Sequence, residues 1–150
     1  MKTINERMEP TMSKLVTVFS YSGKTKAAAE KIAKEIGANV FEIKAKAPYT
    51  TEDVNWRDEN SRCITEWKNA DSRPEVEELP ELDGVDELWI GYPIWCYVQP
   101  RIINSFIEGL KLDGVKIHLF ATSGTHGIEQ SADELKKTYP DVDIVEAKRV

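Results

Sequence analysis

A short stretch of small, hydroxyl-bearing residues has the composition of an anion-binding turn. It reads Ser20-Tyr21-Ser22-Gly23-Lys24-Thr25. The apolar run 15–19 before it has the pattern of a strand, and the Ala-rich segment after it has the pattern of a helix. A helix N-terminus carries unpaired N–H groups and the positive end of the helix dipole, so a turn at this place can hold an anion. The hydroxyls can bind phosphate oxygens, and Gly23 lets the backbone approach closely.

The spacing within this turn indicates which anion it suits. Gly23-Lys24-Thr25 also occurs at the end of nucleoside-triphosphate P-loops, but that motif needs a glycine five residues before the Gly-Lys pair, where this chain has Val18. Hydroxyl side chains in place of the missing glycines favour one terminal phosphomonoester over a polyphosphate with its metal ion. Ser and Thr are also ordinary helix N-caps, so the turn alone leaves a purely structural role open.

Two further segments carry residues suited to binding, and each follows an apolar run that predicts a strand. After the run 87–92 comes an aromatic cluster, Tyr92-Pro93-Ile94-Trp95-Cys96-Tyr97. After the run 117–121 comes a second loop of small residues, Thr122-Ser123-Gly124-Thr125-His126-Gly127. The first offers flat aromatic surface and the second offers exposed backbone with hydroxyls. Trp95 and Tyr97 could instead be core or interface aromatics, and His126 is interpreted as an exposed loop residue rather than a catalytic base.

The elements that must position these loops alternate between strand and helix along the chain. Strands are predicted at 14–19, 39–43, 87–92, 117–121 and 142–145, and helices at 25–36, about 57–68, from Pro100 to about 110, and 128–139. Residues 44–80 are weakly patterned, as functional loops often are. This alternation predicts an α/β fold, a three-layer α/β/α sandwich around a five-stranded parallel sheet.

The predicted sheet would bring the three loops together. In open parallel sheets, ligands bind beyond the carboxyl ends of the strands, at the point where the strand order reverses. A ligand that matched all three loops would carry a phosphate at one end and a planar ring at the other. Riboflavin phosphate, FMN, is such a molecule.

Length and composition limit the alternatives. A chain of 150 residues suits one domain, and its formal charge of −6 disfavours nucleic acid and anionic membranes as partners. Cys63 and Cys96 lack metal-ligand spacing and are predicted to be free thiols. Neither a secretory signal nor a membrane-spanning stretch is evident, which predicts a cytoplasmic protein. We predict an N-terminal extension at 1–13, disordered or a short packing helix, and one domain over 14–150.

The three loops resemble the FMN loops of bacterial single-domain flavodoxins. The resemblance covers about residues 14–145 and is carried most specifically by Gly91-Tyr92-Pro93-Ile94-Trp95 followed by Pro100-Arg101-Ile102. It implies the strand order 2-1-3-4-5. It also implies that Ser20, Ser22, Gly23, Lys24 and Thr25 hold the phosphate, that Pro93, Ile94 and Trp95 line the flavin, and that Thr122, Ser123 and Gly124 meet the other side of the ring. Tyr21, Tyr92, Cys96, Tyr97, Thr125 and Gly127 complete the expected cofactor-binding set.

The activity implied by this resemblance is that of a low-potential one-electron carrier, which exchanges electrons with a flavin reductase and with acceptor redox proteins. No acid–base pair is then required, because the flavin carries the electron. Two alternatives stay open. One is a flavodoxin-like FMN quinone reductase or nitroreductase that takes hydride from NAD(P)H, and the other is a flavin-free module that binds another phosphorylated ligand.

Three departures from the family pattern generate expectations of their own. Lys24 stands where Asn is usual, and its ammonium could strengthen phosphate binding or point to solvent. Cys96-Tyr97 replaces a Trp-Gly pair. In the family a peptide of this loop flips when the flavin is reduced, and glycine makes the flipped conformation less costly, so the replacement predicts weak stabilisation of the one-electron-reduced flavin. The family also places a helix after the fifth strand, whereas this sequence ends at Val150. One sheet face would then lack a cover, so we expect either the N-terminal segment or a second subunit, in a homodimer, to pack there.

Overall fold

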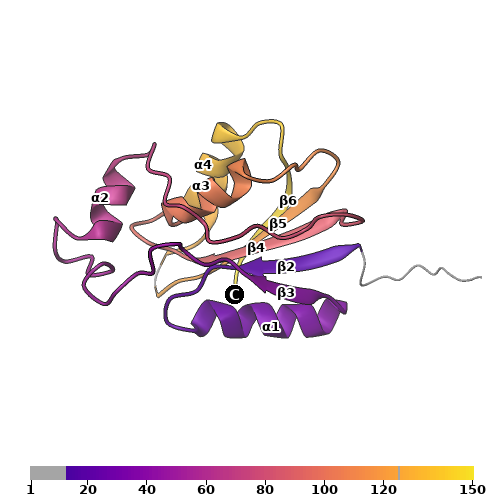
Figure 1. Cartoon of the computed structure of the whole chain (residues 1–150), viewed down its shortest axis with the longest axis horizontal. Helices are drawn as coiled ribbons and strands as arrows, with labels where there is room; N and C mark the ends of the chain where they lie inside the picture. Colours follow the sequence, from indigo (N-terminus) through magenta and orange to yellow (C-terminus); the bar gives the residue numbers. More distant parts are fainter. Residues whose placement is uncertain (1–12, 125) are drawn as a thin grey trace, which may run out of the picture.

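Five parallel strands form the middle layer of the molecule, as the computed structural model shows for residues 13–124 and 126–150 (Figure 1). The strands are β2 (Lys14–Val18), β3 (Asn39–Glu42), β4 (Glu87–Pro93), β5 (Lys116–Thr122) and β6 (Asp143–Arg149). They lie in the order β3-β2-β4-β5-β6, and every neighbouring pair is parallel. The predicted order 2-1-3-4-5 is therefore confirmed.

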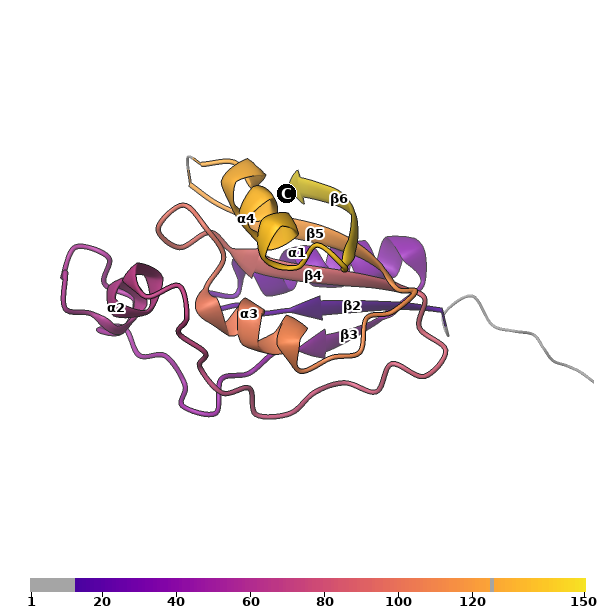
Figure 2. The same ribbon diagram turned by 90° about the horizontal axis from the view of Figure 1, so that it is seen from above.

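Helices cover both faces of this sheet. Helix α1 (Lys24–Ile36) lies on one face, and α3 (Arg101–Glu108) and α4 (Glu129–Thr138) lie on the other (Figures 1 and 2). The three-layer sandwich predicted from the alternating pattern is thus confirmed. The short helix α2 (Arg62–Lys68) stands apart from these layers, beyond the carboxyl ends of the strands. It belongs to the long connection between β3 and β4, residues 43–86.

Each face of the sheet has its own apolar core. On the α1 face, the small side chains Ala29 and Ala33 allow the helix to approach Val16 and Val18 closely. On the opposite face, the α3 stripe that includes Ile103 is fully buried against β4 and β5. Because both faces are packed, the carboxyl ends of β2, β4 and β5 are held at fixed positions, and so are the loops that leave them.

Two elements differ in extent from their predictions. The helix predicted from about residue 57 begins only at Arg62, because the side chains of Asn55 and Asp58 accept hydrogen bonds from nearby backbone N–H groups (3.1 and 2.9 Å) and fold the preceding residues into turns. Strand β6 continues to Arg149, beyond the predicted 142–145. Its second half is polar and exposed, so hydrophobic periodicity does not reveal it, whereas pairing with β5 does.

On one face of the sheet, β6 presents charged side chains beside β5. Val145 is an extra residue in the β5–β6 pairing, which sets Glu146 beside His118 and Lys148 beside Phe120. His118 lies between the carboxylates of Glu146 (2.7 Å) and Glu87 (2.9 Å) and stacks on the Trp89 ring at 4.1 Å. With these charged side chains along β6, this face needs less apolar cover than the sequence suggested. The expected packing of residues 1–12 lies outside the described residues, and the homodimer stays a prediction.

Within residues 13–124 and 126–150, none of the helices has both the length and the apolar composition to cross a lipid bilayer. The same part of the chain holds no group of three or more His, Cys, Asp or Glu side chains placed to bind a metal ion. Cys63 and Cys96 are both free, as predicted; the thiol of Cys63 is buried and that of Cys96 is half-buried. Their environments differ because Cys63 lies in α2 and Cys96 in the loop after β4.

The close approach of β4 and β5 generates a prediction for Gly91. A Cβ at this position would lie 2.1 Å from the fully buried ring of Phe120, so Gly91→Ala forces an overpacked core. We expect the free energy of unfolding in urea to fall by about 1–3 kcal/mol. Gly124→Ala, where a Cβ meets nothing within 4 Å, is the matched control and should leave the unfolding free energy unchanged. Equal losses in the two variants would contradict this packing.

Candidate functional site

The turn after β2 is built as an anion-binding N-terminus. Gly23 has a φ of 95° and its N–H donates to Ser20 Oγ at 3.1 Å, so the Ser20 hydroxyl shapes the turn from within. The first helical hydrogen bond is donated by Ala27 N to Gly23 O. The preceding N–H groups of the first turn have no helical acceptors, and that turn contains no acidic residue. With Lys24 exposed beside them, these groups present a positive, unpaired surface.

The three predicted loops meet at Thr122. Its hydroxyl lies 2.8 Å from that of Thr25, which is buried under the first loop. Its carbonyl accepts a hydrogen bond from Ile94 N at 2.9 Å, which joins the second loop to the third. The loops after β2, β4 and β5 are therefore bonded to one another at a single edge of the sheet.

The loop after β4 closes in a strained two-residue turn. Trp95 and Val98 exchange both backbone hydrogen bonds, Trp95 N to Val98 O at 2.9 Å and Val98 N to Trp95 O at 3.3 Å. Between them, Cys96 and Tyr97 have φ values of 53° and 77°. Turns with positive φ at both central residues normally use Asn and Gly, because a side chain there is costly. The turn carries the Tyr97 ring, 46% exposed, outwards.

Trp95 is directed inwards from this turn. Its ring meets Phe19 and Tyr49 edge to face, with centroid distances of 5.5 and 5.1 Å. Tyr49 is itself fixed, because its hydroxyl donates to Glu66 at 2.6 Å and the Arg62 guanidinium lies 3.7 Å above its ring. Burial is the largest cause of the raised pKa of Tyr49. The Trp95 ring is thus half-buried and held in a fixed position by its neighbours.

The loop after β5 is tied to β6 by hydrogen bonds. Arg149 donates to the carbonyls of Ser123 (3.0 Å) and Gly124 (3.2 Å), and Ser123 Oγ accepts a hydrogen bond from His126 N at 3.0 Å. The His126 ring meets the Tyr97 ring edge to face at 4.5 Å, so the second and third loops face each other through aromatic groups. Thr125, predicted to belong to the site, lies outside the described residues.

Two adjoining cavities extend along this edge. The one beside α1 measures about 510 Å³ and is lined by Lys24, Ala28, Pro93, Ile94, Trp95, Thr122, Ser123, Gly124 and Val150. The other, of about 520 Å³, is lined by Trp56, Ile64, Trp67, Ile94, Cys96, Tyr97, Ser123, Gly124 and His126. Both are lined by Ile94, Ser123 and Gly124, so they adjoin each other at these residues. We call the second, predominantly apolar one the aromatic cavity.

The structure places the remaining predicted residues around or below these cavities. Tyr21 and Ser22 line a third cavity of about 260 Å³ together with Trp56 and Cys63, and Ser20 borders a fourth of about 300 Å³. Tyr92 is fully buried in the core, where its hydroxyl bonds to Ser131 at 2.8 Å and burial raises its pKa. The Tyr92 side chain is therefore not part of the lining of these cavities. Gly127 adjoins Glu129 and lines none of these cavities.

Three residues of the β3–β4 connection contribute to the aromatic cavity although sequence reasoning did not place them there. They are Trp56, Ile64 and Trp67, and Trp56 is 65% exposed. A tryptophan set among charged residues in an irregular segment was the available signal, since loop aromatics without a core role often bind ligands. His126 is an exposed loop residue, as predicted, and it also lines the cavity.

The strain in the second loop can be tested at Cys96. Glycine adopts positive φ without the clash that a Cβ suffers, so Cys96→Gly should raise the free energy of unfolding by up to about 1 kcal/mol over Cys96→Ser. The serine variant is the control, since it removes the sulfur and keeps the Cβ. Chemical denaturation measures both, and a glycine variant no more stable than the serine variant would contradict the strained turn.

Burial also determines the reactivity of this thiol. Removal from water is the main cause that raises the pKa of Cys96 to about 11, and the nearby Cys63 raises it further. In a Cys63→Ser variant, which keeps the burial but loses the Cys63 contribution, the rate of alkylation by iodoacetamide should still increase with pH well above the pKa of a free thiol. An inflection near the value of a free thiol, about 8.5, would contradict the buried position. Because the folded-state pKa is the higher one, the thiol should favour folding at neutral pH and lose that contribution as the pH rises between these values.

Comparison with known proteins agrees with this architecture. A family model described as flavodoxin matches residues 13–150. A candidate flavoprotein from Bacteroides eggerthii is 41% identical with a TM-score of 0.90, over 92% of this chain and 87% of that one. A second candidate flavoprotein, from Bacteroides uniformis, is 36% identical with a TM-score of 0.89, over 91% and 88%. No curated protein matches.

A more distant structure shares the fold. It is a flavoprotein from Lactobacillus acidophilus, solved in complex with FMN, which is 21% identical to this chain with a TM-score of 0.78, over 91% of this chain and 92% of that one. At this identity the likeness concerns the arrangement of strands and helices. The family resemblance predicted from the three loops is confirmed by the match over residues 13–150.

Proposed function

This chain belongs to the flavodoxin family, and we propose that it binds FMN non-covalently and serves as a low-potential one-electron carrier. The observation that carries the proposal is that the two cavities adjoin at one edge of the sheet and share Ile94, Ser123 and Gly124 in their linings. One end offers the Lys24 ammonium and unpaired N–H groups, and the other offers aromatic surface. A ligand with a terminal phosphate and a planar ring fits both ends.

The residues at the α1 end suit the phosphate. The N–H groups of the first helical turn and the ammonium of Lys24 would receive its charge, and the hydroxyl of Ser22 is exposed beside them. Thr25 supports the turn from below through Thr122. These groups form a cradle for one phosphomonoester, as the spacing of the turn predicts.

The aromatic cavity suits the ring. Tyr97 and His126 approach from the second and third loops, while Trp56 and Trp67 form the outer wall. When bound, FMN would supply the capacity to accept and return single electrons. The protein's own contribution is to orient the ring, to exclude water and to disfavour added negative charge. An apolar, electron-rich wall on a chain of formal charge −6 destabilises an anionic ring, which supports a low potential.

The proposed partners are a flavin reductase and acceptor redox proteins of the cytoplasm. The exposed rings of Trp56 and Tyr97 border the aromatic cavity, so a partner could approach its mouth without rearrangement of the sheet. The acidic chain favours partners with basic surfaces. Photoreduced protein should pass electrons to such acceptors one at a time.

A second candidate function has one observation in its favour. The third cavity, of about 260 Å³, is lined by residues 93–96 of the second loop and shares Trp56, Ile94 and Cys96 with the aromatic cavity. It offers room for a second ligand, as an FMN quinone reductase or nitroreductase requires. Rapid oxidation of NAD(P)H without a partner protein would favour that enzyme. A colourless protein that fails to bind added FMN would favour a module for another phosphorylated ligand.

The phosphate end of the proposal is tested by comparing FMN with riboflavin. We expect FMN to bind more tightly, as measured by the change in flavin fluorescence, and Lys24→Gln to reduce this preference by up to about fivefold, the effect of one surface ion pair. Lys31→Gln, on an exposed part of α1 away from the turn, is the control. The preference should also diminish at high salt. Equal affinity for the two flavins would contradict the phosphate cradle.

A further inference from the structure

Helix α2 forms part of the aromatic cavity, yet it lies outside the packed layers. Ile64 and Trp67 come from this helix of seven residues. An isolated helix of this length is not stable in water, so contacts with the rest of the protein must determine where it sits. Its hydrogen bonds to Ala47 and Tyr49 stay within the β3–β4 connection and reach the sheet edge indirectly, through the contacts of the Tyr49 ring with Phe19 and Trp95.

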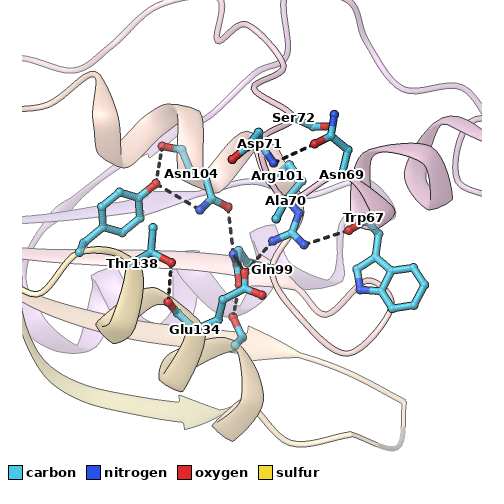
Figure 3. Close-up of polar contacts among 12 residues, drawn as sticks. Trp67, Asn69, Ala70, Asp71, Ser72, Gln99, Arg101, Asn104, Glu134 and Thr138 are labelled. Atoms are coloured by element: carbon cyan, nitrogen blue, oxygen red, sulfur yellow. Dashed lines mark hydrogen bonds and ion pairs between the residues drawn. The ribbon is translucent and has the colours of Figure 1, made fainter.

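Arg101 supplies a contact between α2 and the sandwich. Figure 3 shows its guanidinium between Glu134 of α4 and the backbone of Trp67. Nη1 donates to Glu134 Oε1 at 2.6 Å, and Nη2 donates to the Trp67 carbonyl at 3.0 Å. Gln99 donates to the same Glu134 oxygen at 2.7 Å. The planar fork therefore spans the distance from α4 to α2, with its direction fixed by the carboxylate.

The Trp67 carbonyl is a suitable acceptor for a cation. It lies in the last turn of α2, where the carbonyls have no helical N–H group from which to accept a hydrogen bond. The last backbone hydrogen bond of the helix is donated by Asn69 N to the carbonyl of Thr65. A guanidinium at this end also complements the helix dipole. Arg101 thus caps α2 from another part of the fold and sets the position of the residue that carries the Trp67 ring.

Fold stability alone does not explain a charged residue here. Arg101 is 5% exposed, and its Nε has no hydrogen-bond partner among the described residues. A buried ion pair loses hydration energy comparable to its attraction, and apolar side chains of similar volume are often equally stable in its place. An unpartnered buried N–H adds a further cost. What the guanidinium provides, and an apolar side chain cannot, is the directed bond to α2.

We propose that Arg101 is a positioning residue, which holds α2 against the sandwich and thereby sets the Trp67 wall of the aromatic cavity. It also gives a role to the arginine of the Pro100-Arg101-Ile102 sequence, which lies outside the three loops. The expected effect of Arg101 on FMN binding rests on the proposed function. The expected effect of Arg101 on the position of α2 does not.

The test removes the contact without leaving a buried charge. In Arg101→Met/Glu134→Gln, hydrogen exchange of the amides of residues 62–68 in the FMN-free protein should become faster. The Kd for FMN should rise by about tenfold, as expected for the loss of one charge-assisted hydrogen bond that fixes a ring. Arg101→Lys serves if the double variant does not fold. Its single ammonium cannot span both acceptors, so the same two changes should appear in smaller degree.

The matched control removes an equivalent pair elsewhere. Arg73 binds Glu108 at the end of α3 through Nε at 2.9 and 3.0 Å, and both side chains are partly exposed. Arg73→Met/Glu108→Gln should leave the exchange of residues 62–68 and the FMN affinity unchanged. Unchanged exchange in the Arg101 variants, or the same losses in the control, would overturn the inference. If the unaltered protein bound no FMN, the proposed function would fail, while the exchange measurement would still decide the role of Arg101.

Discussion

The junction at Thr122 is the constraint on which the candidate site depends. Parallel pairing brings the carboxyl ends of β2, β4 and β5 to one edge, and Thr122 then bonds to Thr25 and to Ile94 across that edge. Hydrogen bonds of 2.8 and 2.9 Å leave little freedom between the loops. The two cavities adjoin each other because the backbone of these loops is joined there. Arg149, near the end of the given sequence, bonds to the carbonyls of Ser123 and Gly124 and so ties the third loop to β6.

The candidate site is formed by two parts of the chain, the rigid sheet edge and the β3–β4 connection outside the layers. The rigid part is the sheet edge, where Trp95 is fixed by Phe19 and Tyr49. The added part is the β3–β4 connection, which contributes Trp56 and Trp67 from outside the layers. The first determines where an anion and a ring can lie. The second determines how far the ring is removed from water, which controls the energy of adding charge to it. The affinity and the potential of a bound flavin should therefore respond to different segments of the chain.

Much of the fold was predictable because it depends on regular patterns. Apolar runs alternating with amphipathic segments specify the sandwich, and the turn around Gly23 is readable because its residue types serve a helix N-terminus. The aromatic cavity was less predictable. Trp56 and Trp67 lie in a segment without periodicity, and only its folding back brings them to the sheet edge. The burial of Tyr92 was also hidden, since a strand residue next to a loop can face either the core or the site.

Other features were hidden because long-range contacts decide them. The inward direction of Trp95 depends on Phe19 and Tyr49, which are distant in sequence, and the polar second half of β6 becomes a strand only by pairing with β5. The positive φ values of Cys96 and Tyr97 oppose the local preference of both residues and are maintained by the surrounding loop. Local rules fail at the loop that forms the wall of the cavity, as they often do at functional sites.

Amide chemical shifts recorded while FMN is added to the isotope-labelled, flavin-free protein test the central claim most directly. If the three loops form one site, the amides of residues 22–25, 94–97 and 123–124 should shift together with a single dissociation constant. Those at the opposite end of the sheet, such as residues 87 and 116, should stay unchanged. Shifts confined to one loop, or none in any of the three, would contradict a common site for the phosphate and the ring.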